Sequence, residues 1–181
     1  DYSKSSLSTL FFGSNYYFFF LNLDYSQFTG FKKPLLHTWS LSIEEQFYIF
    51  FPITMFIAFK KFKKNFAFIL WFIFLTSFVL SIVQTEKNQI LSFYSLHSRI
   101  WEFCLGAIAS VYFYRKKLNF TNSFKNLISI FGLVLIFYSL LFLDHKYQHP
   151  SYFTLIPTVG TFLIILFSYK NNFVAKTLSS K

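Results

Sequence analysis

The chain has 181 residues, of which 54% are hydrophobic, 25% are aromatic and only 13% are charged. Soluble domains carry roughly 25% charged residues, so this composition excludes an ordinary water-soluble globular protein. The net charge of +10 does not indicate nucleic-acid binding, because the basic residues lie in short loops between apolar runs and form no single basic face.

The first apolar run, Leu7 to Leu21, is short for a membrane span. As a helix it would reach only about 22 Å, at about 1.5 Å per residue. Its middle carries Gly13, Ser14 and Asn15, which are small or polar. We therefore favour a re-entrant or interfacial segment here over a true span, which the sequence leaves open as the alternative.

Five longer apolar runs follow, each close to the roughly 20 residues that a helix needs to cross the bilayer. They are Trp39 to Phe59, Phe66 to Val83, Ser98 to Tyr114, Leu127 to Leu143, and Tyr152 to Tyr169. The expected fold is all-α: a polytopic transmembrane helix bundle with about five spans plus one re-entrant or interfacial segment. Residues 1–181 are expected to form a single membrane domain. Because the chain begins with Asp1 and not Met, we expect it to be an internal fragment of a longer protein.

The basic residues are distributed unevenly between the two ends of these spans. Basic residues without any acidic one follow the first, third and fifth spans: Lys60, Lys61, Lys63, Lys64, Arg115, Lys116, Lys117, Lys125, Lys170, Lys176 and Lys181. By the positive-inside rule, the loops after Phe59, Tyr114 and Tyr169 are expected to be cytoplasmic. The segments 22–38 and 144–151 and the loop around Glu86 then face outward. We expect His145 and His149, in the second of these segments, to be solvated.

Polar side chains gather at the outward ends of the first and third spans. They are His37, Trp39, Ser42, Glu44, Glu45 and Tyr48 in the first, and His97, Arg99, Trp101 and Glu102 in the third. An ionisable group near the centre of a membrane helix costs about 2.5 to 3.5 kcal/mol on insertion scales, so two adjacent carboxylates suggest a functional use. Glu44 shares a helix face with Tyr48, and Glu45 shares another with Ser42. We expect these groups to share one polar pocket.

Each of these groups also has a purely structural interpretation, which the sequence leaves open. Arg99 and Glu102 can form an ion pair that only fixes packing. The adjacent carboxylates and both imidazoles can simply be solvated at the membrane interface, and the aromatic residues can belong to the belts at the headgroup level. Gly106 and Ser110, four residues apart, are expected to face a neighbouring helix. No zinc-ligand spacing and no nucleotide-binding motif is present, so we expect no metal site and no bound cofactor.

Three segments carry a recognisable pattern. Residues 34–52 read Pro-Leu-Leu-His-Thr-Trp-Ser-Leu-Ser-Ile-Glu-Glu-Gln-Phe-Tyr-Ile-Phe-Phe-Pro. Residues 93–107 contain Arg-Ile-Trp-Glu-Phe-Cys-Leu-Gly, and residues 10–18 contain Ser-Asn-Tyr-Tyr-Phe. In order and spacing these three blocks resemble the acyltransferase-3 family, the membrane O-acyltransferases of the O-antigen acetylase type.

The resemblance implies a multi-pass enzyme of the cell inner (plasma) membrane, with a core of about ten helices of which this chain covers the middle. Such an enzyme moves an acyl group, usually acetyl, from acyl-CoA (acetyl-CoA) to a hydroxyl of a polysaccharide or lipid-linked glycan such as lipopolysaccharide. The implied partners are the lipid bilayer, the acyl-CoA donor and the glycan acceptor, without nucleic acid. The family's catalysis is attributed to a His in its first helix. That helix has no match here, and His37 is not its counterpart.

We hypothesise that Glu44 or Glu45, with His37 as a further supporting candidate, orients the acceptor hydroxyl or the family's catalytic His. Arg99 with Glu102 would hold the first and third spans in register. The remaining pocket residues would be Trp39, Ser42, Tyr48 and Trp101. Two alternative functions stay open: a membrane transporter or glycan-export component, in which the pocket binds a substrate in transit, and a catalytically inactive relative of the family.

Overall fold

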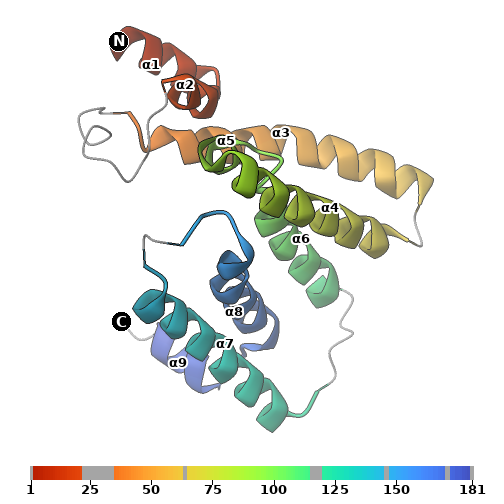
Figure 1. The fold of residues 1–181 in the computed structure, drawn as a ribbon. Helices are drawn as coiled ribbons and strands as arrows, with labels where there is room; N and C mark the ends of the chain where they lie inside the picture. The colour runs from red at the N-terminus through yellow and green to blue at the C-terminus, as the bar shows by residue number, and fades with distance from the viewer. Residues whose placement is uncertain are drawn as a thin grey trace. The chain divides into compact units, whose positions relative to one another are not determined.

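The computed structural model describes residues 2–21, 35–62, 65–114, 120–144, 147–169 and 172–179. Within these ranges the regular secondary structure is entirely helical (Figure 1). The helices group into two compact units. One comprises Asp1–Trp101 with Gln148–Pro150, and the other comprises Glu102–Tyr147 with Ser151–Lys181.

The first unit begins with two short helices that pack on the start of a long one. α1 (Tyr2–Leu10) and α2 (Ser14–Phe20) both contact α3 (Thr38–Lys61), as Figure 1 shows. α4 (Phe66–Lys87) packs beside α3. α5 (Gln89–Tyr94) follows α4 directly and contacts α2, α3 and α4.

The apolar run from Leu7 to Leu21 is not one continuous helix. α1 ends at Leu10 and α2 begins at Ser14. Between them Phe12 has a φ of 54°, a left-handed conformation that a bulky residue rarely adopts. Neither α1 nor α2 is long enough to cross a bilayer, so the segment does not span as a single helix. Its expected position at the membrane interface stays a prediction.

The second unit contains the remaining helices. These are α6 (Ile100–Tyr114) from Glu102 onward, α7 (Asn122–Phe142), the 3-10 helix η2 (Tyr152–Thr154), α8 (Leu155–Phe167) and α9 (Phe173–Ser179). α7 packs along α8, and α9 contacts α7. The start of α9 is tied to α7 because the Asn172 side-chain amide donates to the Ser129 hydroxyl.

Three helices, α3, α4 and α7, are long and apolar enough to cross a membrane. α6 and the segment Tyr152–Phe167 are shorter apolar helices. These five correspond in chain order to the five expected spans, and the expectation of an all-α membrane bundle is confirmed. α5 and α9 were not expected, because six or seven residues are too few to show an apolar period.

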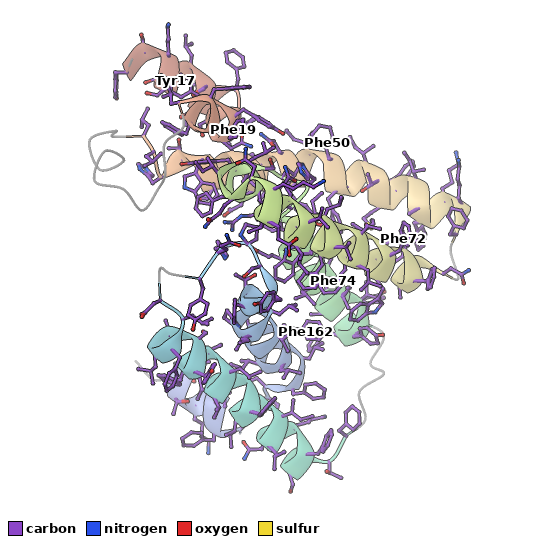
Figure 2. The ribbon with its side chains drawn as sticks, viewed as in Figure 1. Tyr17, Phe19, Phe50, Phe72, Phe74 and Phe162 are labelled. Atoms are coloured by element: carbon purple, nitrogen blue, oxygen red, sulfur yellow. The ribbon has the colours of Figure 1, made fainter. Side chains whose placement is uncertain are left out.

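Large apolar side chains cover the outside of the long helices. Phe50 on α3 and Phe72 on α4, labelled in Figure 2, are each 59% exposed, and Leu141 on α7 is 74% exposed. Water would penalise so extensive an apolar surface, whereas lipid tails accept it. The exposed rings therefore agree with helices that face hydrocarbon.

The contact between α7 and α8 depends on two glycines. A Cβ atom added at Gly132 would lie 2.7 Å from the carbonyl oxygen of Gly160, and a Cβ at Gly160 would lie 2.7 Å from that of Gly132. Real Cβ atoms do not approach backbone oxygens this closely, so any side chain here would push the helices apart. Close backbone approach through small residues is the usual way in which membrane helices associate.

The expected contact through Gly106 and Ser110 is not formed among the described residues. Both residues are exposed, and nothing described lies within 4 Å of a Cβ atom added at Gly106. Spacing within one helix could not identify the pair that does meet, because Gly132 and Gly160 lie on different helices.

We expect Gly132→Ala to destabilise the protein by about 1 to 3 kcal/mol, the usual cost of overpacking against atoms that cannot yield. Gly106→Ala is the matched control. It should be neutral or stabilising by up to about 1 kcal/mol, because Ala favours a helix more than Gly does. Thermal unfolding of the detergent-purified protein measures both, and equal effects would contradict the close contact between α7 and α8.

Candidate functional site at the start of α3

A chain of side-chain amides joins α2, α3 and α5 in the first unit. The Gln46 Nε2 atom donates to the Phe12 carbonyl oxygen at 2.6 Å and to Asn15 Oδ1 at 3.0 Å. Asn15 Nδ2 in turn donates to the Tyr94 carbonyl oxygen at 2.9 Å. We call these four groups the amide chain. It links all three sequence blocks, since Asn15, Gln46 and Tyr94 belong to one block each.

Hydroxyl groups join α1, α2 and α3 one turn further toward the start of α3. Ser14 Oγ lies 2.7 Å from Ser42 Oγ and 3.2 Å from Thr38 Oγ1, and Thr38 Oγ1 lies 3.0 Å from Thr9 Oγ1. Thr38, Ser42 and Gln46 are spaced by four residues and therefore form one stripe along α3. Because Thr38, Ser42 and Ser14 are buried, these contacts replace the water that their polar atoms would otherwise need.

Aromatic rings and one cation pack beside this stripe. The Trp39 ring lies 4.4 Å from the Phe93 ring and 5.4 Å from the Tyr94 ring. The Arg99 guanidinium carbon lies 5.0 Å from the centroids of both the Trp39 and Phe93 rings, and Arg99 Nε donates to the Phe93 carbonyl oxygen at 3.3 Å. We call Trp39, Phe93, Tyr94 and Arg99 the mouth cluster. It brings together the start of α3 and the residues just before α6. The predicted pocket that would also include Glu44, Glu45 and Glu102 stays a prediction.

The segment that enters α6 is held by α4. Ser77 Oγ donates to the His97 carbonyl oxygen at 2.6 Å and accepts from the Trp101 backbone N–H at 3.1 Å. The Trp101 ring is fully buried, with its centroid 5.2 Å from that of Phe78. Trp101 is thus a packing residue here, and its indole Nε1 has no hydrogen-bond partner among the described residues.

His149 packs against the mouth cluster, although it was expected to be solvated. Its ring centroid lies 6.0 Å from that of Phe93, and the next residue, Pro150, accepts a hydrogen bond from Thr85 Oγ1 through its carbonyl oxygen at 2.6 Å. Burial, and secondarily the charge of Arg99, lower the pKa of His149 from 6.5 to about 4. The imidazole is therefore neutral at physiological pH. His145 lies outside the described residues.

The other predicted ionisable groups of the first unit are distributed more widely. His37 is exposed just before α3. Burial lowers the pKa of His97, and its Nε2 atom forms a hydrogen bond with the Gln84 side chain. Glu44 and Glu45 are half-buried and have no hydrogen bond or ion pair within the described part of the chain. Tyr48 is 58% exposed. The proposed roles of these residues stay predictions.

Glu102 belongs to the second unit, where it lines a cavity of about 270 Å³. Gly106 lies one turn further along α6, and Thr158, Thr161 and Phe162 line the cavity from α8 (Phe162 is labelled in Figure 2). The two threonine hydroxyls donate to backbone carbonyl oxygens four residues earlier in the chain. The cavity wall is therefore mostly apolar, and Glu102 is the ionisable residue among those that line it. That Arg99 acts together with Glu102 stays a prediction.

No group of three or more His, Cys, Asp or Glu side chains within the described ranges is arranged to hold a metal ion. The expected absence of a metal site stays a prediction for the whole protein.

We expect the protein to lose stability as the pH falls from 6.5 to 4, in part through His149. In that window the unfolded chain binds a proton at His149 and the native chain does not, so acidification favours unfolding. His149→Gln should remove about 1 to 2 kcal/mol of this pH dependence. Thermal unfolding across the pH range measures it, with His37→Gln at an exposed imidazole as the control. An unchanged slope in His149→Gln would contradict the burial of this side chain.

Comparison with known proteins identifies the family. A family model described as an acyltransferase domain matches residues 5–180. An uncharacterised protein of Haemophilus influenzae is 30% identical over 168 residues, which cover 88% of this chain and 68% of that protein. O-acetyltransferase OatA of Staphylococcus aureus is 27% identical over 190 residues, which cover 98% of this chain and 31% of OatA.

A third relative is the Bacillus subtilis protein provisionally named peptidoglycan O-acetyltransferase YrhL. It is 31% identical over 118 residues, which cover 63% of this chain and 19% of YrhL. This chain thus spans only about a third of OatA and about a fifth of YrhL. No solved structure gives a significant match. Because the family model covers nearly the whole chain, the chain belongs to the acyltransferase-3 family and is an acyltransferase domain.

Proposed function

We propose that the protein containing this chain is a membrane O-acyltransferase that moves an acetyl group from acetyl-CoA to a hydroxyl of a cell-envelope glycan. The observation that carries the proposal is the family match over residues 5–180. The names of OatA and YrhL agree with O-acetyl transfer, and the name of YrhL suggests peptidoglycan as one acceptor to test.

The reaction makes four demands on the protein: a proton acceptor, a proton donor, hydrogen-bond donors for the developing negative charge, and placement of the hydroxyl. The acceptor hydroxyl attacks the thioester carbonyl carbon, so a C–O bond forms while the C–S bond breaks. The hydroxyl proton must leave to a base, and the thiolate of CoA takes up a proton as it departs. The oxygen that becomes negatively charged on the way needs hydrogen-bond donors. Precise placement of the hydroxyl is the part that residues near the start of α3 can supply.

We further propose that donor and acceptor approach from opposite sides of the inner (plasma) membrane. The strong excess of basic residues after the first, third and fifth spans supports cytoplasmic loops there, which would leave the mouth cluster outward. Several residues concerned lie outside the described ranges: segment 22–34, Lys63, Lys64, Arg115, Lys116, Lys117, Lys146, Lys170 and Lys181. Cysteine labelling of these loops in intact cells would test the orientation.

Glu44 and Glu45 are the residues that we propose for orienting the acceptor hydroxyl or the proton acceptor. A half-buried carboxylate in an apolar helix is costly, and neither makes an ion pair within the described chain. A carboxylate that makes no hydrogen bond or ion pair with the described residues can bind a substrate group instead. Arg99 would hold the outward end of the site, since its guanidinium lies 5.0 Å from the Trp39 ring.

We expect Glu44→Gln, Glu45→Gln or both to lower acetyl transfer about tenfold or more, because correct proton placement contributes about 100-fold or more to such reactions. Arg99→Ala should lower it as well. The assay uses membranes that contain the full-length protein and adds labelled acetyl-CoA. The label transferred to envelope glycan is measured at matched protein levels.

Glu86→Gln, at an exposed carboxylate near the end of α4, is the control and should retain full activity. Undiminished transfer in all three site variants would end the proposed roles. Absence of transfer by the unaltered protein would instead favour the export component or the inactive relative.

A further inference from the structure

The amide chain leaves no freedom in how its two side-chain amides are oriented. The carbonyl oxygens of Phe12 and Tyr94, at its two ends, can only accept hydrogen bonds. Gln46 must therefore present its nitrogen to Phe12, and Asn15 must present its nitrogen to Tyr94. The remaining Asn15 Oδ1 atom then faces the second hydrogen of Gln46 Nε2, at 3.0 Å.

Water cannot take over the role of Asn15. Its side chain is fully buried, and the Tyr94 side chain is only 1% exposed. Without Asn15 this buried carbonyl loses a hydrogen bond that water cannot replace, and folded proteins consistently avoid such a loss. The position of the Tyr94 peptide therefore depends on the Asn15 amide.

The Tyr94 peptide also determines where the mouth cluster lies. Phe93 and Tyr94 end α5 and present the rings that pack on Trp39, at 4.4 Å and 5.4 Å. The Phe93 ring and carbonyl are in turn two of the groups that Arg99 contacts. A shift of this peptide moves the Phe93 ring, and with it the guanidinium that lies over that ring.

We propose that Asn15 is a positioning residue for the acceptor side of the site: by donating to the Tyr94 carbonyl it fixes the mouth cluster, and with it the geometry that the glycan hydroxyl meets. The inference rests on the proposed O-acetyl transfer. Because the donor is proposed to approach from the other side of the membrane, loss of Asn15 should lower kcat/KM for the glycan and leave the KM for acetyl-CoA unchanged.

Two variants test this. Asn15→Asp keeps the size of the side chain but turns a carboxylate oxygen toward the Tyr94 carbonyl, so the donor becomes a repelling acceptor. Asn15→Ser removes both amide contacts without burying a charge. Misplacing reactive groups by about 1 Å can cost about 100-fold in rate, so we expect kcat/KM for the glycan to fall about ten- to hundredfold in both.

Asn88→Asp is the matched control. The Asn88 side chain is exposed and only accepts, from the Leu91 backbone N–H at 3.0 Å, which a carboxylate does equally well. The assay uses membranes that contain the complete protein, labelled acetyl-CoA, and envelope glycan prepared from cells that lack the protein. Each substrate is varied in turn, and membrane levels and thermal midpoints are recorded for every variant.

The inference is supported if kcat/KM for the glycan falls in both Asn15 variants, KM for acetyl-CoA stays within about twofold, and Asn88→Asp matches the unaltered protein. It is overturned if the Asn15 variants transfer acetyl normally. It is also overturned if both variants vanish from the membrane, or if KM for acetyl-CoA rises as much as KM for the glycan, because Asn15 would then be merely structural. If the unaltered protein transfers no acetyl, the proposed function fails and the inference fails with it. If the unaltered protein and the Asn15 variants transfer acetyl equally well, only the inference fails.

Discussion

The first unit depends on hydrogen bonds between buried polar atoms, because a polar atom that is shielded from water needs a hydrogen-bond partner within the protein. Lipid tails are as apolar as leucine, so apolar contact alone gives membrane helices little preference for one arrangement over another. The amide chain supplies that preference. Gln46 and Asn15 satisfy two main-chain carbonyls from different elements, and a shift of α2 or α5 along α3 would break at least one of these bonds.

Much of the fold could be predicted from the sequence because its long helices are continuous apolar runs. α4 begins at Phe66 and α6 ends at Tyr114, as expected from where the apolar character starts and stops. Only the small and polar residues after Phe12 indicated the break between α1 and α2. The amide chain could not be predicted, because Asn15 is 31 residues from Gln46 and 79 from Tyr94, and no local period relates such positions.

His149 shows why local sequence misleads about an outer loop. It stands among polar residues before a proline, a composition typical of solvated turns. Its burial comes instead from partners on other elements, namely the Phe93 ring and the bond from Thr85 to the neighbouring carbonyl. This burial, and secondarily the charge of Arg99, lower the pKa of His149, so tertiary contacts keep neutral an imidazole that was expected to be solvated.

The geometry of α3 separates the polar residues of its signature into two sets. Thr38, Ser42 and Gln46 lie within about 40° of one direction, at 100° per residue, and all of them bond to α1 or α2. Glu44 points about 160° from Ser42, away from that stripe, whereas Glu45 lies about 60° from it, beside Thr38. The stripe therefore accounts for the packing of α1 and α2 on α3, and neither carboxylate takes part in its hydrogen bonds. Because Glu44 points farther from the α1 and α2 contacts, it is the better placed of the two to meet a group that this chain does not supply.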